Sequence, residues 1–240
     1  MRADLHLIET GVFDTRAKAQ EAIAAGLVRV NGEPVRKPSQ KIPQGAAVTA
    51  EPAHPWVSRA ALKLAAGLDA FGVDPAGLFC LDVGSSTGGF TEVLLARGAA
   101  RVAAVDVGRD QLAPKLKADP RVLSLEATDA RTLTPAMIGG APDLIVCDAS
   151  FIGLEKVIAR PLSLAGEGAV LVALFKPQFQ VGRAAIGKGG IVKDEAAVQA
   201  ALDAACAFLE DAGWSVKGIT ESPIQGGDGN RERLICARRR

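Results

Sequence analysis

From Leu78 to the C-terminus, apolar segments of strand length alternate with segments of helical pattern. This alternation is typical of α/β domains, in which helices cover a parallel sheet. The predicted strands are residues 79–83, 101–106, 122–125, 144–147 and 169–175, and two late strands are predicted at 214–220 and 233–237. The predicted helices are residues 90–97, 110–117, 154–164 and 194–212. The sequence therefore predicts a Rossmann-like α/β domain.

The first part of the chain has a different pattern. Two short helical segments, at residues 2–9 and 15–25, precede the segment LVRVNGEPV, in which Asn31-Gly32 separates two short strands. Asn-Gly between apolar residues is the strongest short-range signal for a β-hairpin. The proline-containing segment EPAHPWV has the composition of a linker. We therefore expect a small α+β domain at residues 1–52, a linker at 53–57 and the larger domain at 58–240.

Composition excludes several classes of protein. The 240-residue chain has a net charge of +1, so any contact with nucleic acid must come from a local basic patch. Its four cysteines form no C-x-x-C pair, which disfavours a zinc site, and we expect no metal. We see no signal peptide, and no apolar run reaches the ~18 residues of a membrane helix. We therefore expect a soluble cytoplasmic protein.

A glycine-rich turn follows the first strand of the larger domain, in the segment LDVGSSTGGF. Glycines let a ligand approach backbone N–H groups, and the N-terminus of the next helix favours anionic groups. The spacing differs from G-x-G-x-x-G, and no Gly-Lys-Ser/Thr follows. Asp106 ends the next strand, where a carboxylate can bind a ribose diol, and Asp129 follows the third strand. These features favour a nucleoside-containing cofactor over a turn needed only for packing.

A different glycine-rich segment, GRAAIGKGG at residues 182–190, has the spacing of a P-loop but lacks the Ser or Thr after Lys188. No strand leads directly into it, so we interpret it as a flexible loop near the site and reject nucleotide hydrolysis.

Two ionisable residues follow neighbouring predicted strands: Asp148 in LIVCDAS and Lys176 in LVALFKPQF. The carboxyl ends of parallel strands line the ligand crevice, so we expect these side chains to lie close together. They form either a structural ion pair or a site in which Lys176 is a general base. Desolvation and a second cation can lower a lysine pKa from its usual ~10.4. Lys63 and Glu232 supply a second lysine and a second acid.

Seven segments spread over the chain form a specific combination: DTRAKAQEAIAAGLVRVNGEPVRKP, WVSRAALKL, DVGSSTGGFTEVLLARGA, VCDASFI, LFKPQF, GKGGIV and GNRERL. This combination resembles the TlyA (haemolysin A) family, in which an alpha-L RNA-binding domain of the ribosomal protein S-four type precedes an FtsJ-like methyltransferase. The resemblance implies a class I fold that uses S-adenosylmethionine (SAM) to methylate ribose 2′-oxygens of ribosomal RNA, with cytidine the expected nucleoside. The short N-terminus favours the large-subunit RNA as the target.

The resemblance also implies roles for individual residues. An FtsJ-type tetrad maps onto Lys63, Asp148, Lys176 and Glu232: Lys176 is the base, Lys63 and Asp148 hold the hydroxyl and tune the base, and Glu232 steadies Lys63 or the ribose. Asp106 takes the cofactor ribose and Asp129 lies near the adenine. The residues expected around the methionine end are Asp82, Gly84, Ser85, Thr87, Gly88 and Gly89. The expected RNA contacts are Arg2, Arg16, Lys18, Arg29, Arg36, Lys37, Lys41 and Arg59.

Three further expectations concern aromatics, assembly and the linker. Trp56 and Phe151 are expected to pack in a core or at the domain junction rather than to stack on bases. The chain is expected to act as a monomer on ribosomal RNA or a ribosomal subunit, away from membranes. The linker sequence HPWVSRA departs from the family, since many relatives carry a basic residue in place of His54 or Pro55.

Three alternative functions remain open at the level of sequence. A membrane-active cytolysin, which the older family name suggests, is disfavoured because no strongly amphipathic cationic helix is evident. An RNA-binding protein with an inert Rossmann-like domain is disfavoured because all four tetrad positions are present. An NAD-dependent oxidoreductase is disfavoured by the glycine spacing.

Overall fold

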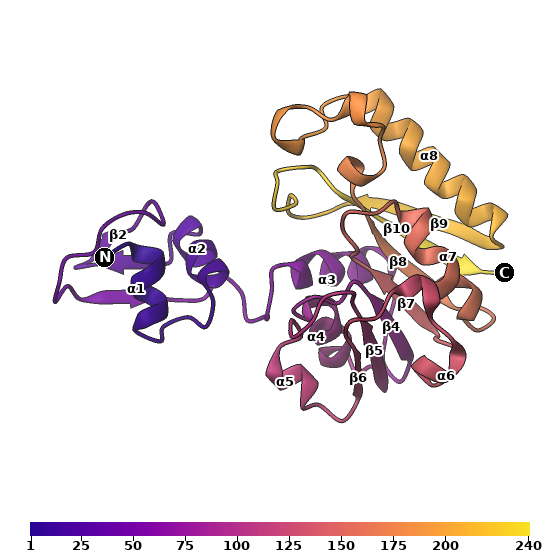
Figure 1. Ribbon diagram of the computed structural model, residues 1–240, viewed down its shortest axis with the longest axis horizontal. Coiled ribbons are helices and arrows are strands. Elements are labelled where there is room, and N and C mark those ends of the chain that lie inside the picture. The colour runs from indigo at the N-terminus through magenta and orange to yellow at the C-terminus, as the bar shows by residue number, and fades with distance from the viewer. The chain divides into compact units, whose positions relative to one another are not determined.

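The computed structural model describes all residues from 1 to 240 and divides the chain into two compact units, Met1–Trp56 and Val57–Arg240 (Figure 1). No helix in either unit is both long enough and apolar enough to cross a membrane.

The first unit combines two helices with a three-stranded antiparallel sheet. Its elements are α1 (Ala3–Glu9), α2 (Arg16–Ala24), β1 (Val28–Val30), β2 (Glu33–Pro34) and β3 (Val48–Ala50), and the strand order is β2-β1-β3. Asn31 and Gly32 both have positive φ, 52° and 85°, as a two-residue hairpin turn requires. The helices and the hairpin agree with the sequence prediction to within one residue at each helix end. Strand β3 was not predicted, because three residues with one alanine give no usable alternation.

The second unit is built on a seven-stranded sheet. Its strands are β4 (Phe79–Val83), β5 (Arg101–Val105), β6 (Val122–Leu125), β7 (Leu144–Cys147), β8 (Val170–Phe175), β9 (Trp214–Glu221) and β10 (Arg233–Arg239). The order is β6-β5-β4-β7-β8-β10-β9, and the five strands from β4 to β8 are parallel. After β6 the chain returns to place β7 on the other side of β4, so the topological switch point lies between β4 and β7. The predicted Rossmann-like α/β fold is confirmed.

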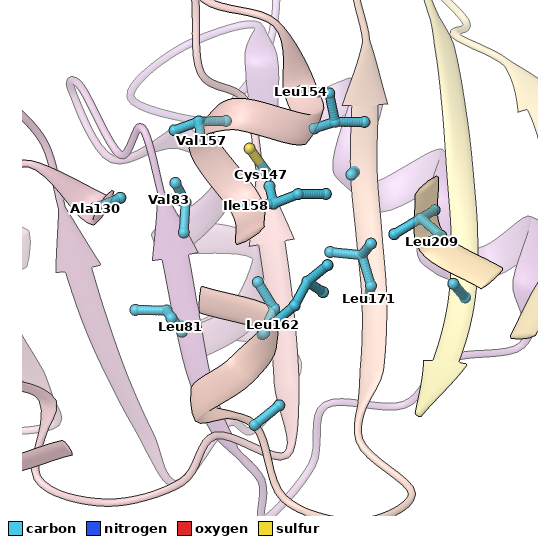
Figure 2. Close-up of a cluster of buried hydrophobic side chains, with 14 of the residues drawn as sticks. Leu81, Val83, Ala130, Cys147, Leu154, Val157, Ile158, Leu162, Leu171 and Leu209 are labelled. Atoms are coloured by element: carbon cyan, nitrogen blue, oxygen red, sulfur yellow. The ribbon is translucent and has the colours of Figure 1, made fainter. Parts of the chain in front are cut away.

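Helices cover both faces of this sheet (Figure 1). They are α3 (Ala60–Phe71), α4 (Gly89–Ala96), α5 (Pro114–Lys117), α6 (Pro135–Ile138), α7 (Leu154–Leu164) and α8 (Glu195–Asp211). On one face, Ile158 and Leu162 of α7 pack with Leu81 and Leu171 of the strands in the main core (Figure 2). On the opposite face α3 packs closely, since a Cβ on its Gly67 would lie 2.9 Å from Leu234 Cδ2 of β10.

Two features of the second unit differ from the sequence prediction. Strand β10 enters the sheet antiparallel between β8 and β9, whereas the sequence pattern indicated a parallel sheet. The predicted helix at 110–117 is reduced to α5, the four residues Pro114–Lys117. Asp110 has a φ of 53°, and a proline disfavours the helical conformation in the residue before it, so the chain at 106–113 is a loop.

Candidate active site

The four tetrad residues (Lys63, Asp148, Lys176 and Glu232) converge at one edge of the sheet. Asp148 and Lys176 follow the adjacent parallel strands β7 and β8, so both leave the sheet at its carboxyl edge. Strand β10 is antiparallel to β8 and pairs Arg233 with Phe175, which brings the residue before β10 to the same edge. Lys63 reaches the site from the second turn of α3. The antiparallel insertion of β10 is therefore what places Glu232 beside the other three.

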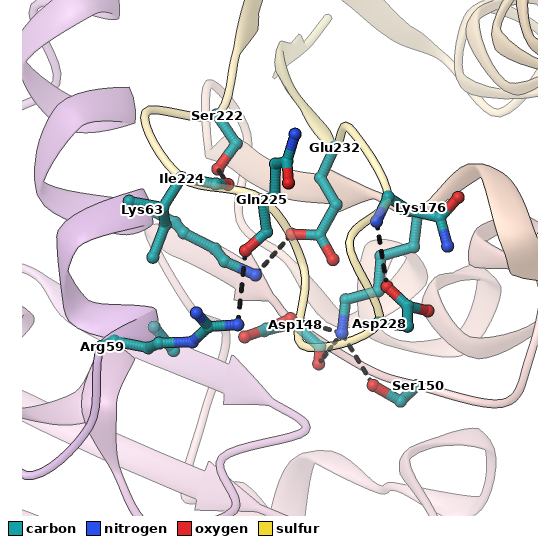
Figure 3. Close-up of polar contacts among 12 residues, drawn as sticks. Arg59, Lys63, Asp148, Ser150, Lys176, Ser222, Ile224, Gln225, Asp228 and Glu232 are labelled. Atoms are coloured by element: carbon teal, nitrogen blue, oxygen red, sulfur yellow. Dashed lines mark hydrogen bonds and ion pairs between the residues drawn. The ribbon is translucent and has the colours of Figure 1, made fainter. Parts of the chain in front are cut away.

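Two ion pairs join the tetrad (Figure 3). Lys63 Nζ donates to Glu232 Oε2, and both side chains are buried. Lys176, also buried, lies with its Nζ 2.6 Å from Asp148 Oδ1 and donates hydrogen bonds to Ser150 Oγ at 2.7 Å and to the carbonyl oxygen of Asp148 at 3.1 Å. Asp148 Oδ1 lies close to Lys176 Nζ but accepts no hydrogen bond from it. Nζ of Lys176 therefore makes two well-directed hydrogen bonds beside a carboxylate.

The buried acid of the tetrad is electrostatically perturbed. Burial raises the pKa of Glu232 above its usual value, and the hydrogen bond from Lys63 opposes that rise. Buried charges are tolerated when they are paired and hydrogen-bonded, and such clusters are frequent at functional sites. Burying these charged side chains costs free energy, which a sheet edge with only a structural role would not require.

A cavity of about 500 Å³ lies beside the tetrad, at the switch point between β4 and β7. Gly84, Asp106, Asp129 and Asp148, four of the residues singled out from the sequence, line it. Gly84 has a φ of 82°, and a Cβ there would lie 2.8 Å from Cα of Ala149, so no other residue fits this turn. The cavity has the position at which open α/β sheets bind ligands.

Asp106 holds the rim of this cavity through its two carboxylate oxygens. Oδ2 accepts from the backbone N–H of Ser86 at 2.8 Å, and Oδ1 accepts from that of Gly108 at 2.7 Å. The carboxylate therefore joins the glycine-rich turn to the loop after β5. Asp129 is held differently, since it caps the 3₁₀ turn Ala130–Thr132 and pairs with Arg131 at 2.5 Å.

The remaining predicted cofactor residues do not line this cavity. Asp82 is fully buried at the end of β4, with Oδ2 accepting from Thr91 Oγ1 at 2.6 Å and Oδ1 without a partner. Ser85 Oγ is also buried and without a partner. Burial raises the pKa of Asp82 to about 7, although the Thr91 hydrogen bond opposes the rise. These two oxygens beneath the glycine-rich turn can therefore still accept hydrogen bonds from a polar ligand group.

Packing explains the other glycines of the turn. Gly88 has a φ of 96°, and a Cβ there would lie 2.2 Å from Leu116 Cδ1. A Cβ on Gly89 would lie 2.6 Å from Ser58 Oγ. The carbonyl oxygen of Thr87 accepts from the N–H of Ala113. These three residues seat helix α4 and the loop before α5, and none of them is among the residues that line the cavity.

Sequence reasoning missed several residues that line the cavity. They are Val83, Ser86, Val105, Val107, Gly108, Gln111, Thr128, Ala130, Arg131, Ala149, Ser150, Ile152 and Val157. Only Val107 could have been found from the sequence, because an apolar residue in the loop directly after Asp106 is a candidate to contact a ligand. Its side chain is exposed. The others come together only through the loops that the fold brings to this edge.

The expectation that Phe151 packs in a core is wrong. Its side chain is 92% exposed, and its backbone φ is 65°, a conformation that bulky residues rarely adopt. Its ring contacts that of Phe179 with centroids 5.3 Å apart, and the residue directly follows Ser150, a partner of Lys176. An exposed aromatic ring therefore stands next to the tetrad. Trp56 is half-buried.

The glycine-rich loop at residues 182–190, predicted to lie near the site, is anchored together with the residues that follow it by Asn230. The buried Asn230 accepts from the N–H of Val192 through Oδ1 and donates to the carbonyl oxygen of Gly190 through Nδ2, both at 2.9 Å. A second cavity, of about 350 Å³, is lined by residues 191–193, which follow this loop, together with Glu232 and Arg233. Asn230 thus joins the loop to the segment that carries Glu232.

The candidate RNA contacts are distributed over both units. In the first unit Arg2 and Arg16 share the carboxylate of Asp4, while Lys18 pairs with Asp14 at 3.2 Å. Arg29 donates to the carbonyl oxygen of Gly32 at 3.1 Å. Of the candidate RNA contacts in that unit, the four that are exposed and form no ion pair are Arg29, Arg36, Lys37 and Lys41. In the second unit Arg59 donates to the carbonyl oxygen of Gln225 at 3.3 Å (Figure 3).

Comparison with known proteins identifies both parts of the chain. The FtsJ-like methyltransferase family model matches residues 56–239, and the S4 domain model matches residues 1–48. The 16S/23S rRNA (cytidine-2'-O)-methyltransferase TlyA of Mycobacterium tuberculosis is 45% identical over 99% of this chain and 89% of that protein. The 23S rRNA (cytidine-2'-O)-methyltransferase TlyA of Campylobacter jejuni is 40% identical over 74% of this chain and 68% of that protein.

A solved structure from Streptococcus thermophilus that carries the hemolysin name is 40% identical, with a TM-score of 0.80, and the match covers 100% of this chain and 88% of that one. The family predicted from the seven sequence segments is therefore confirmed. The chain belongs to the FtsJ-like methyltransferase family, within its TlyA group, and carries an S4 domain at its N-terminus.

Proposed function

We propose that this protein transfers a methyl group from SAM to the 2′-oxygen of a cytidine ribose in ribosomal RNA. The observation that carries the proposal is the convergence of the buried tetrad beside a cavity at the switch point of a methyltransferase fold. Relatives that cover the chain are named for the same reaction. We propose the large-subunit RNA as the principal target.

The cavity and the turn beneath it fit SAM. The Asp106 carboxylate can accept from the ribose hydroxyls, and Asp129, which also lines the cavity, would lie near the adenine. The unpartnered Asp82 Oδ1 and Ser85 Oγ would accept from the charged amino group of the methionine end. SAM supplies a methyl group bound to a positively charged sulfur, which is a good leaving group.

We assign the base to Lys176. A neutral lysine amine has two N–H donors and one lone pair. The two hydrogen bonds of Nζ, to Ser150 Oγ and to the Asp148 carbonyl oxygen, use both donors and direct the lone pair elsewhere. Nζ then takes the proton of the ribose 2′-OH as that oxygen forms its bond to the methyl carbon and the carbon–sulfur bond breaks.

The other tetrad members keep this geometry. Asp148 steadies the lysine after it gains the proton, because its Oδ1 lies 2.6 Å from Nζ. Lys63 contributes a second cation at the same edge, where it can orient the 2′-oxygen. Glu232 holds Lys63 in place through their ion pair. Most of the acceleration comes from holding the nucleophile in line with the methyl group.

We further propose that residues 1–52 are an RNA-binding domain connected by a linker at 53–57, and that Phe151 stacks on the target base. An exposed ring beside the tetrad suits this role, since base–aromatic stacking contributes about 1–3 kcal/mol per base.

The test uses labelled SAM and ribosomal subunits from a strain that lacks the modification, with the label located by nucleotide. We expect label on a ribose 2′-oxygen, lost in Lys176→Ala while SAM binding is nearly unchanged. Lys156→Ala, which removes an exposed lysine of α7, is the matched control and should retain activity. Label on a base would refute the assignment of the tetrad. Absence of label despite SAM binding would favour an inert domain.

A further inference from the structure

Asp4 is a fully buried carboxylate in the first turn of α1, and it accepts five hydrogen bonds. Oδ1 accepts from Nε of Arg2 at 2.9 Å and from the N–H of Leu5 at 3.1 Å. Oδ2 accepts from Nη2 of Arg2 at 2.9 Å, from Nε of Arg16 at 2.8 Å and from Nε2 of Gln20 at 3.0 Å. These hydrogen bonds, with that of Arg2 the largest cause, hold the pKa of Asp4 well below its usual range. The group is therefore ionised under ordinary conditions.

The two arginines are ordered by Asp4 but are not used up by it. Arg2 donates to Asp4 through Nε and Nη2, so its Nη1 remains available. Arg16 donates only through Nε, so both of its terminal nitrogens remain available. Their side chains remain 42% and 54% exposed, although the carboxylate between them is buried. Two guanidinium groups are thus fixed on one anion with donors still directed to the surface. The three charges together leave one excess positive charge.

The backbone around Asp4 is held independently of its side chain. The N–H of Ala3 donates to the carbonyl oxygen of Gln40 at 2.8 Å, and the N–H of Asp4 donates to that of Pro38 at 3.1 Å. Arg2 also forms a β-bridge with Lys41. A structural ion pair alone would need only one arginine, whereas the second arginine comes from the start of α2 and leaves its terminal nitrogens free. The arrangement therefore suits the presentation of two arginines better than the closure of the fold.

We infer that Asp4 is a positioning residue that holds Arg2 and Arg16 as a preformed site for one phosphate group of the RNA. A guanidinium group matches two phosphate oxygens, and a side chain that is already ordered loses less entropy on binding. The inference rests on the proposed function, because it takes the ligand of this unit to be RNA. It assigns the buried acid a role that increases affinity for an anion, although its own charge is negative.

The inference is tested by whether removal of the negative charge of Asp4 strengthens or weakens RNA binding. Asp4→Asn removes a negative charge from an RNA-binding surface, so electrostatics alone predicts tighter binding. The positioning role predicts weaker binding, by about fivefold to tenfold, because the arginines lose the anion that orders them. Loss of one phosphate contact should also reduce the slope of log affinity against log salt by about 0.7–0.9. The matched control is Asp14→Asn, which makes the same charge change at an exposed acid paired with Lys18 and should tighten binding slightly.

The assay measures binding of the full-length protein to unmodified large-subunit ribosomal RNA over a range of salt. Methyl transfer gives a second readout: Asp4→Asn should raise KM for RNA and leave kcat and SAM affinity unchanged, which general unfolding would not do. Arg16→Lys covers the case in which Asp4→Asn fails to fold. It keeps the charge and can still pair with Asp4 but presents no planar fork, so weaker binding is expected for it as well.

Tighter binding by Asp4→Asn, equal to that of Asp14→Asn, would overturn the inference, and so would wild-type affinity in Arg16→Lys. Failure of the wild-type protein to bind RNA would overturn it too. RNA binding without methyl transfer would count against the proposed function alone, since the affinities of the variants would still decide the role of Asp4.

Discussion

The buried carboxylate of Asp82 should make the second unit lose stability as pH rises. Burial raises its pKa from 3.8 to about 7, and Oδ1 has no partner that would compensate the charge. A group whose pKa is higher in the folded state than in the unfolded state binds its proton more tightly when folded. Its contribution to stability is therefore complete below pH 3.8 and is lost as pH rises through about 7.

The size of the effect follows from the shift. A change of about three pKa units at ~1.36 kcal/mol per unit corresponds to about 4 kcal/mol between pH 4 and pH 8. Asp82→Asn has nearly the same shape, still accepts from Thr91 and carries no charge, so it removes this dependence. The free energy of unfolding of the variant, relative to wild type, should rise by about 3–4 kcal/mol from pH 4 to pH 8. An unpaired buried N–H of the new amide costs about 1–3 kcal/mol, so the net gain at pH 8 is smaller.

The assay is urea unfolding monitored by tryptophan fluorescence at pH 4 to 8. Trp56 lies in the first unit and the buried Trp214 in the second, so a Trp56→Phe background makes the signal specific to the second unit. Glu232, whose pKa is also raised, is present in both proteins, and the difference isolates Asp82. A relative change below about 1 kcal/mol, or one of opposite sign, would refute the reasoning.

Asp106→Asn is the control for this prediction. Both oxygens of Asp106 accept backbone hydrogen bonds, from Ser86 and Gly108, and an amide nitrogen cannot replace one of them as acceptor. This substitution should destabilise by about 1 kcal/mol at pH 8, opposite in sign to Asp82→Asn. SAM affinity should fall in both variants, because we propose both carboxylates as cofactor contacts.

Three further predictions concern the tetrad, the turn and the loop. Lys63→Met and Glu232→Leu should each cost about 3–5 kcal/mol in unfolding free energy, whereas the double variant should lie within about 2 kcal/mol of wild type and be inactive; additive losses would contradict this. Gly84→Ala, at a positive φ where a Cβ overlaps neighbouring backbone, should cost at least 1–3 kcal/mol and abolish SAM binding measured by calorimetry; normal binding would count against the site. Asn230→Ala removes two side-chain hydrogen bonds of about 1 kcal/mol each, so trypsin should cut residues 183–193 about thirtyfold faster, with Asn230→Asp intermediate; equal rates would show that the anchor is unimportant.

The sequence located the main sheet and two of the four tetrad residues for the same physical reason. Buried parallel strands are apolar throughout, so a charged residue directly after such a strand is conspicuous, as Asp148 and Lys176 are. Lys63 and Glu232 have no such position, and only the resemblance to a family connected them with the site. The roles of all four residues remain a prediction that the proposed experiments test.

The glycine-rich turn shows the limit of motif reasoning. Gly84, Gly88 and Gly89 look equivalent in the sequence, yet Gly84 lines the cavity while Gly88 and Gly89 seat α4 against Leu116 and Ser58. The same limit applies to Phe151, which the sequence suggested would be buried and which is exposed beside the tetrad. Whether a residue packs or faces a ligand depends on what lies opposite it, and those neighbours are distant in the sequence.

By itself, the sequence determined the α/β class, the strands of the parallel sheet and the family, because periodicity and local motifs are properties of short segments. Only the tertiary structure decided that β10 lies antiparallel beside β8, so that Glu232 reaches Lys63, and that Arg2 and Arg16 share Asp4. Apart from the pair Arg2–Asp4, these arrangements depend on pairings between residues well separated in the chain. Such pairings are fixed by packing and by the need to compensate buried charge, and no local pattern encodes either one.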